Sequence, residues 1–167
     1  IRAYSAINGD LVWRFNSLPL VGGLGSETWA EGALNTAGGA NNWTGMALDV
    51  ERELLFVPTG SAAPDFYGAS RLGDNLFANS LVCLDADTGE RVWHFQFIHH
   101  TVWDYDLPAA PNLIDITVNG REIKAIAQVT KQGFTDACDR ATGVPVRPRI
   151  ERPVSAATKP GESAAET

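Results

Sequence analysis

The chain has 167 residues, which is enough for one domain with a hydrophobic core. Its 44% hydrophobic and 20% charged residues are typical of a folded globular protein. The net charge of -7 argues against a nucleic-acid partner, because binding to phosphates requires a basic surface. No run of about 18 apolar residues occurs, so the sequence predicts no membrane span. Cys83 and Cys138 each lie in an apolar, strand-like run and are predicted to be buried free thiols.

A repeated hairpin pattern is the clearest feature of the chain. Each copy is a strand-like run, a tight turn containing glycine and a second strand-like run; the copies are residues 3–13, residues 84–93 and, more weakly, residues 138–146. The first turn is Asn8-Gly9, a dipeptide in which both residues tolerate positive φ. In two copies a tryptophan, Trp13 or Trp93, follows the turn. A large flat ring at this position can dock one sheet onto the next.

The remaining sequence also predicts short strands separated by turns. Strand-like runs at residues 43–48 and 54–58 flank a charged turn, and runs at residues 113–118 and 122–129 flank an Asn-Gly turn. No segment has a sustained helical stripe. The sequence therefore predicts an all-β fold.

The repeats predict a β-propeller of four-stranded antiparallel blades that dock through tryptophans. Blades of about 40–50 residues would place an incomplete arc of roughly three blades in residues 1–144. Residues 145–167 are rich in Pro, Ala, Glu and Arg and are predicted to be a loop or disordered tail. Because a propeller protects its strand edges by closing radially, an open arc would leave edges exposed. We therefore expect the chain to be a piece of a longer protein.

Several segments carry residues suited to chemistry. Residues 99–111 contain two His and two Asp, which suit acid–base work or a metal, or else form a polar turn whose carboxylates cap backbone N–H groups. Lys131 follows an apolar strand and is functional if the strand end faces a pocket, or else simply solvated. Trp43 lies near Gly38 and Gly39 and offers a stacking face to a ligand, or else packs in the core.

A set of short motifs follows a fixed order along the chain. The motifs are Gly39-Ala40-Asn41-Asn42-Trp43, Pro58-Thr59-Gly60, residues 73–80, Trp93-His94-Phe95-Gln96, His99-His100 with Trp103-Asp104 and Asp106-Leu107-Pro108, and Lys131-Gln132-Gly133. In this order they resemble the dehydrogenases that depend on pyrroloquinoline quinone (PQQ), and most of all the glucose and quinate dehydrogenase branch. The resemblance extends over residues 2–153 and covers a central part of the eight-bladed propeller of that family.

The resemblance implies roles for individual residues. Asp104 matches the catalytic carboxylate, which accepts the proton of the substrate hydroxyl and lies beside Ca²⁺. Lys131 matches a cation that hydrogen-bonds the quinone oxygens, and Trp43 matches the tryptophan that stacks under the PQQ ring. Ser61 falls where methanol-oxidising relatives place an Asn ligand to Ca²⁺, so the implied metal ligands are Asp104 and Ser61. The residues matched to cofactor binding are Trp43, Asn41, Lys131 and Ala63.

The resemblance also implies a function for the longer protein. It implies oxidation of the CH–OH group of a sugar, cyclic polyol or other alcohol with PQQ and Ca²⁺, and transfer of electrons to a quinone or cytochrome. It implies a periplasmic location, with any membrane contact made by segments outside this chain. Because the cofactor takes ligands from many blades, the isolated chain is expected to be inactive.

Two other classes of protein remain as alternatives. A non-catalytic propeller scaffold with PQQ-like repeats would need Trp13 and Trp93, but it would not need the site residues. A carbohydrate-binding β-domain would use the aromatic side chains as sugar platforms, but it does not explain Lys131. Two segments depart from the family pattern: Thr101 stands where an Asp is expected, and Asp136-Ala137 interrupts an alternating run and predicts a weakened strand.

Overall fold

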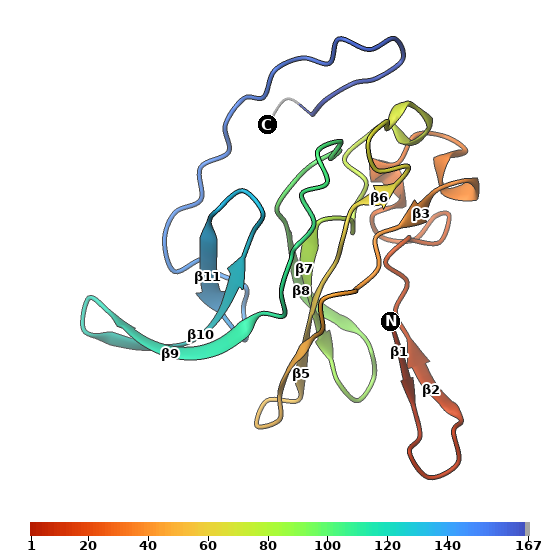
Figure 1. Cartoon of the computed structure of the whole chain (residues 1–167). Coiled ribbons are helices and arrows are strands. Elements are labelled where there is room, and N and C mark those ends of the chain that lie inside the picture. Colours follow the sequence, from red (N-terminus) through yellow and green to blue (C-terminus); the bar gives the residue numbers. More distant parts are fainter. Residues whose placement is uncertain (166–167) are drawn as a thin grey trace.

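The computed structural model describes residues 1–165 and has an all-β architecture with short 3₁₀ helices. Its main sheets stand side by side as separate antiparallel units (Figure 1). The strands are β1 (Arg2–Tyr4), β2 (Leu11–Arg14), β3 (Gly38–Gly39), β4 (Ala47–Asp49), β5 (Leu54–Pro58), β6 (Ala62–Ala63), β7 (Ser80–Asp85), β8 (Arg91–Gln96), β9 (Asn112–Val118), β10 (Arg121–Val129) and β11 (Thr135–Asp139). The 3₁₀ helices are η1 (Ser26–Thr28), η2 (Ala33–Asn35) and η3 (Ala69–Arg71).

One complete blade forms the centre of the structure. Strands β4, β5, β7 and β8 pair in that order as an antiparallel meander. Because side chains alternate along a strand, the blade presents two apolar faces. One face carries Phe56, Cys83 and Trp93 and packs against Ile126 of β10. The other face, which includes Val82, packs toward the β1–β2 sheet.

Partial blades flank the central blade on both sides. Strands β9, β10 and β11 form a three-stranded sheet in the order β11-β10-β9, and a bridge between Cys138 and Pro145 extends it. Strands β1 and β2 form a two-stranded sheet on the other side (Figure 1). The prediction of an incomplete propeller arc with parts of three blades is confirmed.

Tryptophan docking joins the sheets. The indole N–H of Trp93 donates to the carbonyl oxygen of Arg140 at 2.8 Å, and its ring packs on Gly143. The indole N–H of Trp13 donates to the carbonyl oxygen of Ala86 at 2.9 Å, and its ring packs on Gly89. In both cases the acceptor lies three residues before the glycine, so the two contacts are copies of one device. Docking between sheets predicts that both rings are buried; this is confirmed for Trp93, whereas Trp13 is only half-buried beside the two-stranded sheet.

Two strand predictions are corrected by the structure. The strand predicted at residues 43–48 begins only at Ala47, because the side-chain amide of Asn42 donates to the carbonyl oxygens of Gly45 and Pro58 and holds the preceding segment in a loop. The strand predicted to be weakened at Asp136 forms as β11. There the Asp136 carboxylate receives two hydrogen bonds from Arg149, at 2.9 and 2.5 Å, which compensate for its polarity.

Residues 146–165 contain no helix or strand, but specific contacts hold them against the sheets. The guanidinium of Arg149 lies 3.5 Å from the centre of the Phe95 ring. Further along, the Glu162 carboxylate accepts hydrogen bonds from His100 at 2.9 Å and from the Gly68 amide at 2.5 Å. Burial raises the pKa of Glu162, but the hydrogen bonds from His100, Gly68 and Ser163 outweigh it, and the pKa is lowered overall.

Both cysteines are buried free thiols, which confirms the prediction. Burial raises the pKa of Cys83 to about 12 and that of Cys138 to about 11, so neither is a reactive thiolate near neutral pH. None of the helices in residues 1–165 is long and apolar enough to cross a membrane.

Candidate active site

The meander topology brings the predicted site residues to one end of the central blade. In an antiparallel meander, the start of β4, the end of β5, the start of β7 and the end of β8 share one end. Trp43 precedes β4, Ser61 follows β5, Asn79 precedes β7 and Asp104 follows β8. Lys131 reaches the same place from the end of β10 in the neighbouring sheet. Loops on a rigid scaffold are where binding residues tend to lie.

Asp104, Lys131 and Trp43 lie together, although they are far apart in sequence. The Lys131 ammonium donates to the Asp104 carbonyl oxygen at 2.8 Å and to its carboxylate at 3.1 Å. The same nitrogen lies 5.9 Å from the centre of the Trp43 ring. The Lys131 and Asp104 side chains are 30% and 44% exposed, so their ion pair contributes at most about 1 kcal/mol. Lys131 can therefore exchange Asp104 for an anionic ligand at little cost.

Asp104 also has a strained backbone. Its φ of 56° is in the left-handed region, which is uncommon for residues other than glycine. Such a conformation costs about 1–3 kcal/mol and persists where the surrounding structure enforces it, often at functional sites. Here the strain accompanies a carboxylate that remains accessible to a ligand.

Asp106 and Asn79 belong to the same cluster, although the family resemblance gave neither of them an individual role. The Asp106 carboxylate accepts a hydrogen bond from the indole N–H of Trp43 at 3.0 Å and another from the Ser61 amide at 2.5 Å. The Asn79 side-chain amide donates to the Tyr105 carbonyl oxygen at 3.0 Å and to the Ser61 hydroxyl at 3.3 Å. The Asn79 Oδ1 atom is buried and has no hydrogen-bond partner among residues 1–165.

The other predicted residues lie on the loops around Gly60. Ser61 is buried and is held by its amide and its hydroxyl as described. Asn41 is exposed, and its carbonyl oxygen accepts a hydrogen bond from the Gly60 amide at 3.0 Å. Ala63 is half-buried in β6, where it pairs with Gly38 of β3. The structure thus brings Ser61 into the cluster and places Asn41 and Ala63 in the loops that shape it.

The two histidines occupy other positions. His100 is buried, and its ring contacts the carbonyl oxygen of Gly73 at 2.8 Å and the Glu162 carboxylate at 2.9 Å. His99 lies 4.0 Å from the carboxylate of Asp74. Thr101, which departs from the family pattern, is buried, and its carbonyl oxygen accepts a hydrogen bond from a buried arginine at 2.6 Å. The contacts of His100 and Thr101 give these two residues a structural role.

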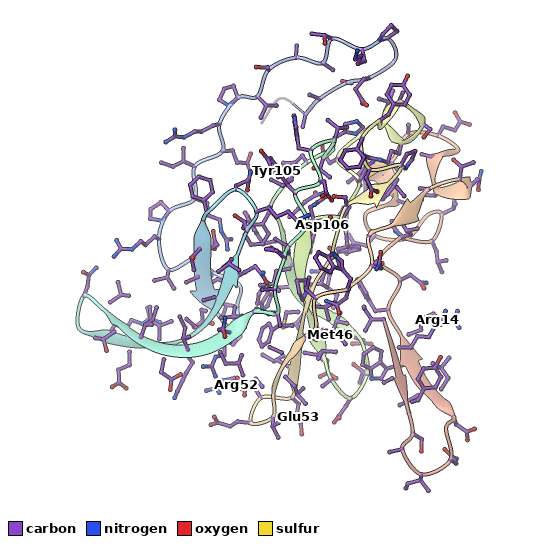
Figure 2. All side chains as sticks on the ribbon, in the orientation of Figure 1. Arg14, Met46, Arg52, Glu53, Tyr105 and Asp106 are labelled. Carbon is purple, nitrogen blue, oxygen red and sulfur yellow. The ribbon has the colours of Figure 1, made fainter. Side chains whose placement is uncertain are left out.

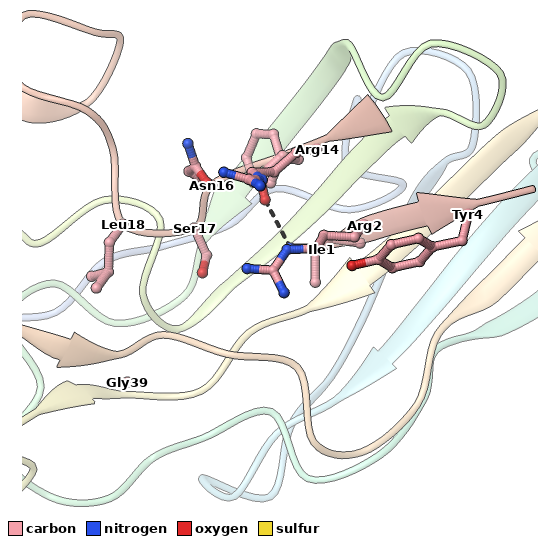
Figure 3. A pocket seen from close by; sticks show the side chains of 9 residues that line it. Ile1, Arg2, Tyr4, Arg14, Asn16, Ser17, Leu18 and Gly39 are labelled. Atoms are coloured by element: carbon pink, nitrogen blue, oxygen red, sulfur yellow. Dashed lines mark hydrogen bonds between the residues drawn. The ribbon is translucent and has the colours of Figure 1, made fainter. Parts of the chain in front are cut away.

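Two hollows lie near these elements. A groove of about 960 Å³ passes between β8, β11 and residues 146–154, and Trp103 and Tyr105 line it. A shallower hollow lies beside β1 and β2, and Figure 3 shows Arg2, Arg14 and Gly39 among the residues that line it. The described residues that line the two hollows include none of Asp104, Lys131 and Trp43. The groove is the hollow that adjoins the Asp104 segment, because Trp103 and Tyr105, which flank Asp104 in the sequence, line it.

The fold and the site define a class of protein, a tryptophan-docked propeller with a carboxylate, a cation and an exposed aromatic ring at one end of a blade. Residues 1–167 match the family model for the PQQ-type glucose/ethanol/alcohol dehydrogenase β-propeller domain. The chain belongs to the PQQ-dependent quinoprotein dehydrogenase family.

Individual relatives agree with this assignment. The chain is 35% identical to quinoprotein glucose dehydrogenase A of Acinetobacter calcoaceticus, with 96% of the chain and 20% of that protein covered. It is 34% identical to a quinate/shikimate dehydrogenase (quinone) of Acinetobacter baylyi, with 100% of the chain and 20% of that protein covered. The solved quinohemoprotein alcohol dehydrogenase ADHIIG of Pseudomonas putida superposes with a TM-score of 0.80 at 34% identity, over 87% of this chain and 23% of that one. The chain therefore spans about a fifth of the length of the curated relatives it matches.

The residues present fit the cofactor of this family. PQQ is a flat polyanion, and Trp43 is 55% exposed with its ring beside the Lys131 ammonium. A flat exposed ring and a cation are the groups that such a molecule requires. Oxygen donors for a hard cation are present as the carboxylate of Asp104 and the unpartnered Oδ1 of Asn79. However, residues 1–165 contain no cluster of three or more His, Cys, Asp or Glu side chains placed to hold a metal, so this chain supplies an incomplete set.

Proposed function

We propose that the longer protein containing this chain oxidises the CH–OH group of a sugar, cyclic polyol or other alcohol, with PQQ and Ca²⁺ as cofactors. The observation that carries the proposal is the convergence of Asp104, Lys131 and Trp43 at one end of the central blade. A non-catalytic scaffold would need the docking tryptophans and would have no use for this convergence.

Each of the three side chains has a distinct task in the proposal. Oxidation of an alcohol removes two electrons and two protons, and bound PQQ supplies the acceptor for the electrons. Asp104 accepts the proton of the substrate hydroxyl at its carboxylate, which is 44% exposed and can be reached by a substrate. The Lys131 ammonium stabilises the negative charge that develops on the cofactor as it accepts electrons. The ring of Trp43 fixes the plane of the bound cofactor and excludes water from one of its faces.

The proposal also includes a Ca²⁺ ion bound at this site. Asp104 and Ser61 are the ligands that we assign to it from this chain, and the buried, unpartnered Oδ1 of Asn79 is a further oxygen beside Ser61, whose hydroxyl lies 3.3 Å from the Asn79 amide nitrogen. Ca²⁺ takes about 6–8 oxygen ligands, so the remaining ligands must come from elsewhere in the longer protein or from the cofactor. Removal of Ca²⁺ by a chelator should therefore abolish activity, and its return should restore activity.

The electron acceptor is proposed from the relatives. The names of the Acinetobacter baylyi and Pseudomonas putida proteins specify a quinone and a quinohemoprotein, respectively. We accordingly propose a membrane quinone or a cytochrome as acceptor and a periplasmic location for the longer protein. The isolated chain is expected to be inactive, because other blades of the longer protein are needed to complete its site.

The experiment is to express the full-length protein without cofactor and to add PQQ and Ca²⁺ separately and together. Reduction of an artificial dye with aldoses, quinate and simple alcohols as substrates should require PQQ. Dye reduction that persists without PQQ would refute the cofactor assignment. Failure of the full-length protein to bind PQQ would instead favour the scaffold.

A further inference from the structure

Asp106 makes two unusually well-defined contacts in the site. One carboxylate oxygen accepts the indole N–H of Trp43 at 3.0 Å, and the other accepts the Ser61 amide at 2.5 Å. The carboxylate also packs on Gly60, where an added Cβ would lie 3.1 Å from its atoms. One side chain therefore links the loop before β4 to the loop after β5.

Asp106 is itself anchored in the core. The carbonyl oxygen of the preceding residue, Tyr105, accepts a hydrogen bond from the buried Asn79 at 3.0 Å. The following residue, Leu107, is 1% exposed and belongs to the main apolar cluster. Figure 2 shows Tyr105 and Asp106 near the middle of the molecule, by the ends of the central strands. The carboxylate is thus presented from a fixed backbone.

The side chain of Trp43, in contrast, has little of the core packed around it. It lies outside the strands, in the loop before β4, and 55% of it is exposed. An indole has a single N–H donor in the plane of its ring, so a hydrogen bond to it restricts both the position and the rotation of the ring. Because the acceptor is a carboxylate, the bond is stronger than a neutral one. The contact with Asp106 therefore fixes the plane of a ring whose face remains open.

The geometry points to Asp106 as a positioning residue that orients Trp43 for stacking on the cofactor and sets the Ser61 loop beside it. This inference rests on the proposed function, because it takes the open face of Trp43 as the PQQ platform. Asp106 does not accept the substrate proton in this assignment, since both of its oxygens are already occupied by N–H donors.

The test is a double-mutant cycle for PQQ binding to the full-length apoprotein at saturating Ca²⁺. The variants are Asp106→Asn, Trp43→Phe and the double variant, with Asp87→Asn as the matched control in the exposed turn beyond the other end of β7. In Asp106→Asn the amide group must face one of the two N–H donors, so that one hydrogen bond to a charged acceptor is lost. We expect its PQQ dissociation constant to rise about 10-fold, the low end for such a bond because the pair is partly exposed.

The coupling between the two sites decides the inference. If Asp106 acts through Trp43, the double variant binds PQQ no more weakly than Trp43→Phe alone. An excess of PQQ should restore the turnover of Asp106→Asn and should not restore that of Asp104→Asn. If Asp106→Asn does not fold, Asp106→Glu replaces it in the cycle, because it keeps the charge but moves the carboxylate relative to the indole N–H of Trp43.

Other outcomes overturn the inference. Independent, multiplicative effects of the two substitutions would show that Asp106 does not act through Trp43. An unchanged PQQ dissociation constant with a higher Ca²⁺ requirement would make Asp106 a metal ligand. Wild-type protein that binds no PQQ would refute the proposed function itself, which distinguishes that failure from a failure of the positioning role.

Discussion

The docking of Trp93 on Gly143 makes a sharp prediction about what holds neighbouring blades together. Gly143 has a φ of 71°, and a Cβ added there would lie 2.8–3.0 Å from three atoms of the Trp93 ring. Gly120 has a φ of 79° in the β9–β10 turn, and an added Cβ would meet no atom within 4 Å. The two glycines therefore share the same backbone requirement, and only one of them is in contact with a ring.

Alanine at either position should cost about 1–2 kcal/mol, because a residue with a Cβ is disfavoured in the left-handed region. Gly143→Ala should cost about 1–3 kcal/mol more than Gly120→Ala, because Trp93 is 7% exposed and its ring must shift to relieve the collision. The measurement is the urea midpoint and slope of the full-length protein, compared between the two variants. Equal destabilisation by both substitutions would refute the conclusion that glycine is required there for docking.

Three further predictions concern the site and the segment after the third blade. Asp104→Asn in the full-length holoenzyme should lower turnover by about 10²–10⁴-fold while PQQ stays bound, because the amide keeps the shape but cannot accept a proton; wild-type turnover would exclude Asp104 as the base. Lys131→Ala should slow reduction of the cofactor and raise the PQQ dissociation constant; an unchanged dissociation constant in an equilibrium titration would contradict its assignment. The lowered pKa of Glu162 means that its contribution to docking is present above the usual glutamate pKa of about 4.3 and is lost as the pH falls through the folded value. Hydrogen exchange at Gly68, corrected for intrinsic rates, should therefore quicken in acid in wild type and change less in Glu162→Gln; the same acid response in both would contradict this role for Glu162.

The docking repeats could be predicted from sequence because their signal is local. A glycine in a tight turn followed shortly by a tryptophan specifies both halves of the contact, and Trp93 forms it as expected. The bounds of individual strands were harder to predict. Strand β4 begins late because Asn42 binds two backbone carbonyl groups, one of them 16 residues away. Strand β11 tolerates Asp136 because Arg149 lies beside it, and alternation alone contains no sign of this partner.

The site was predicted in part for a similar reason. Asp104, Lys131 and Trp43 occur in recognisable motifs, so their chemistry could be assigned before their proximity was known. Asn79 belongs to the site because its side chain contacts Ser61 and Tyr105, which lie on two other loops. A local sequence pattern does not predict contacts between loops that are far apart in the chain. The contact of Glu162 with His100 spans 62 residues and escaped prediction in the same way.

The segment Trp103-Asp104-Tyr105-Asp106 nevertheless contained a signal that explains the architecture of the site. Its residues alternate in their contacts: the two aromatic rings lie 6.0 Å apart in a stacked arrangement and line the groove, whereas the two carboxylates face the site. One short run therefore contributes to two surfaces at once. Asp106, two residues after Asp104, lies in the same cluster. Asp104, which has a left-handed backbone, keeps the exposure that the general base of the proposed function needs. An alternation of aromatic and acidic residues in the loop that follows the last strand of a blade thus places two carboxylates in one cluster: the one that we propose as the base, and the one that we propose organises its surroundings.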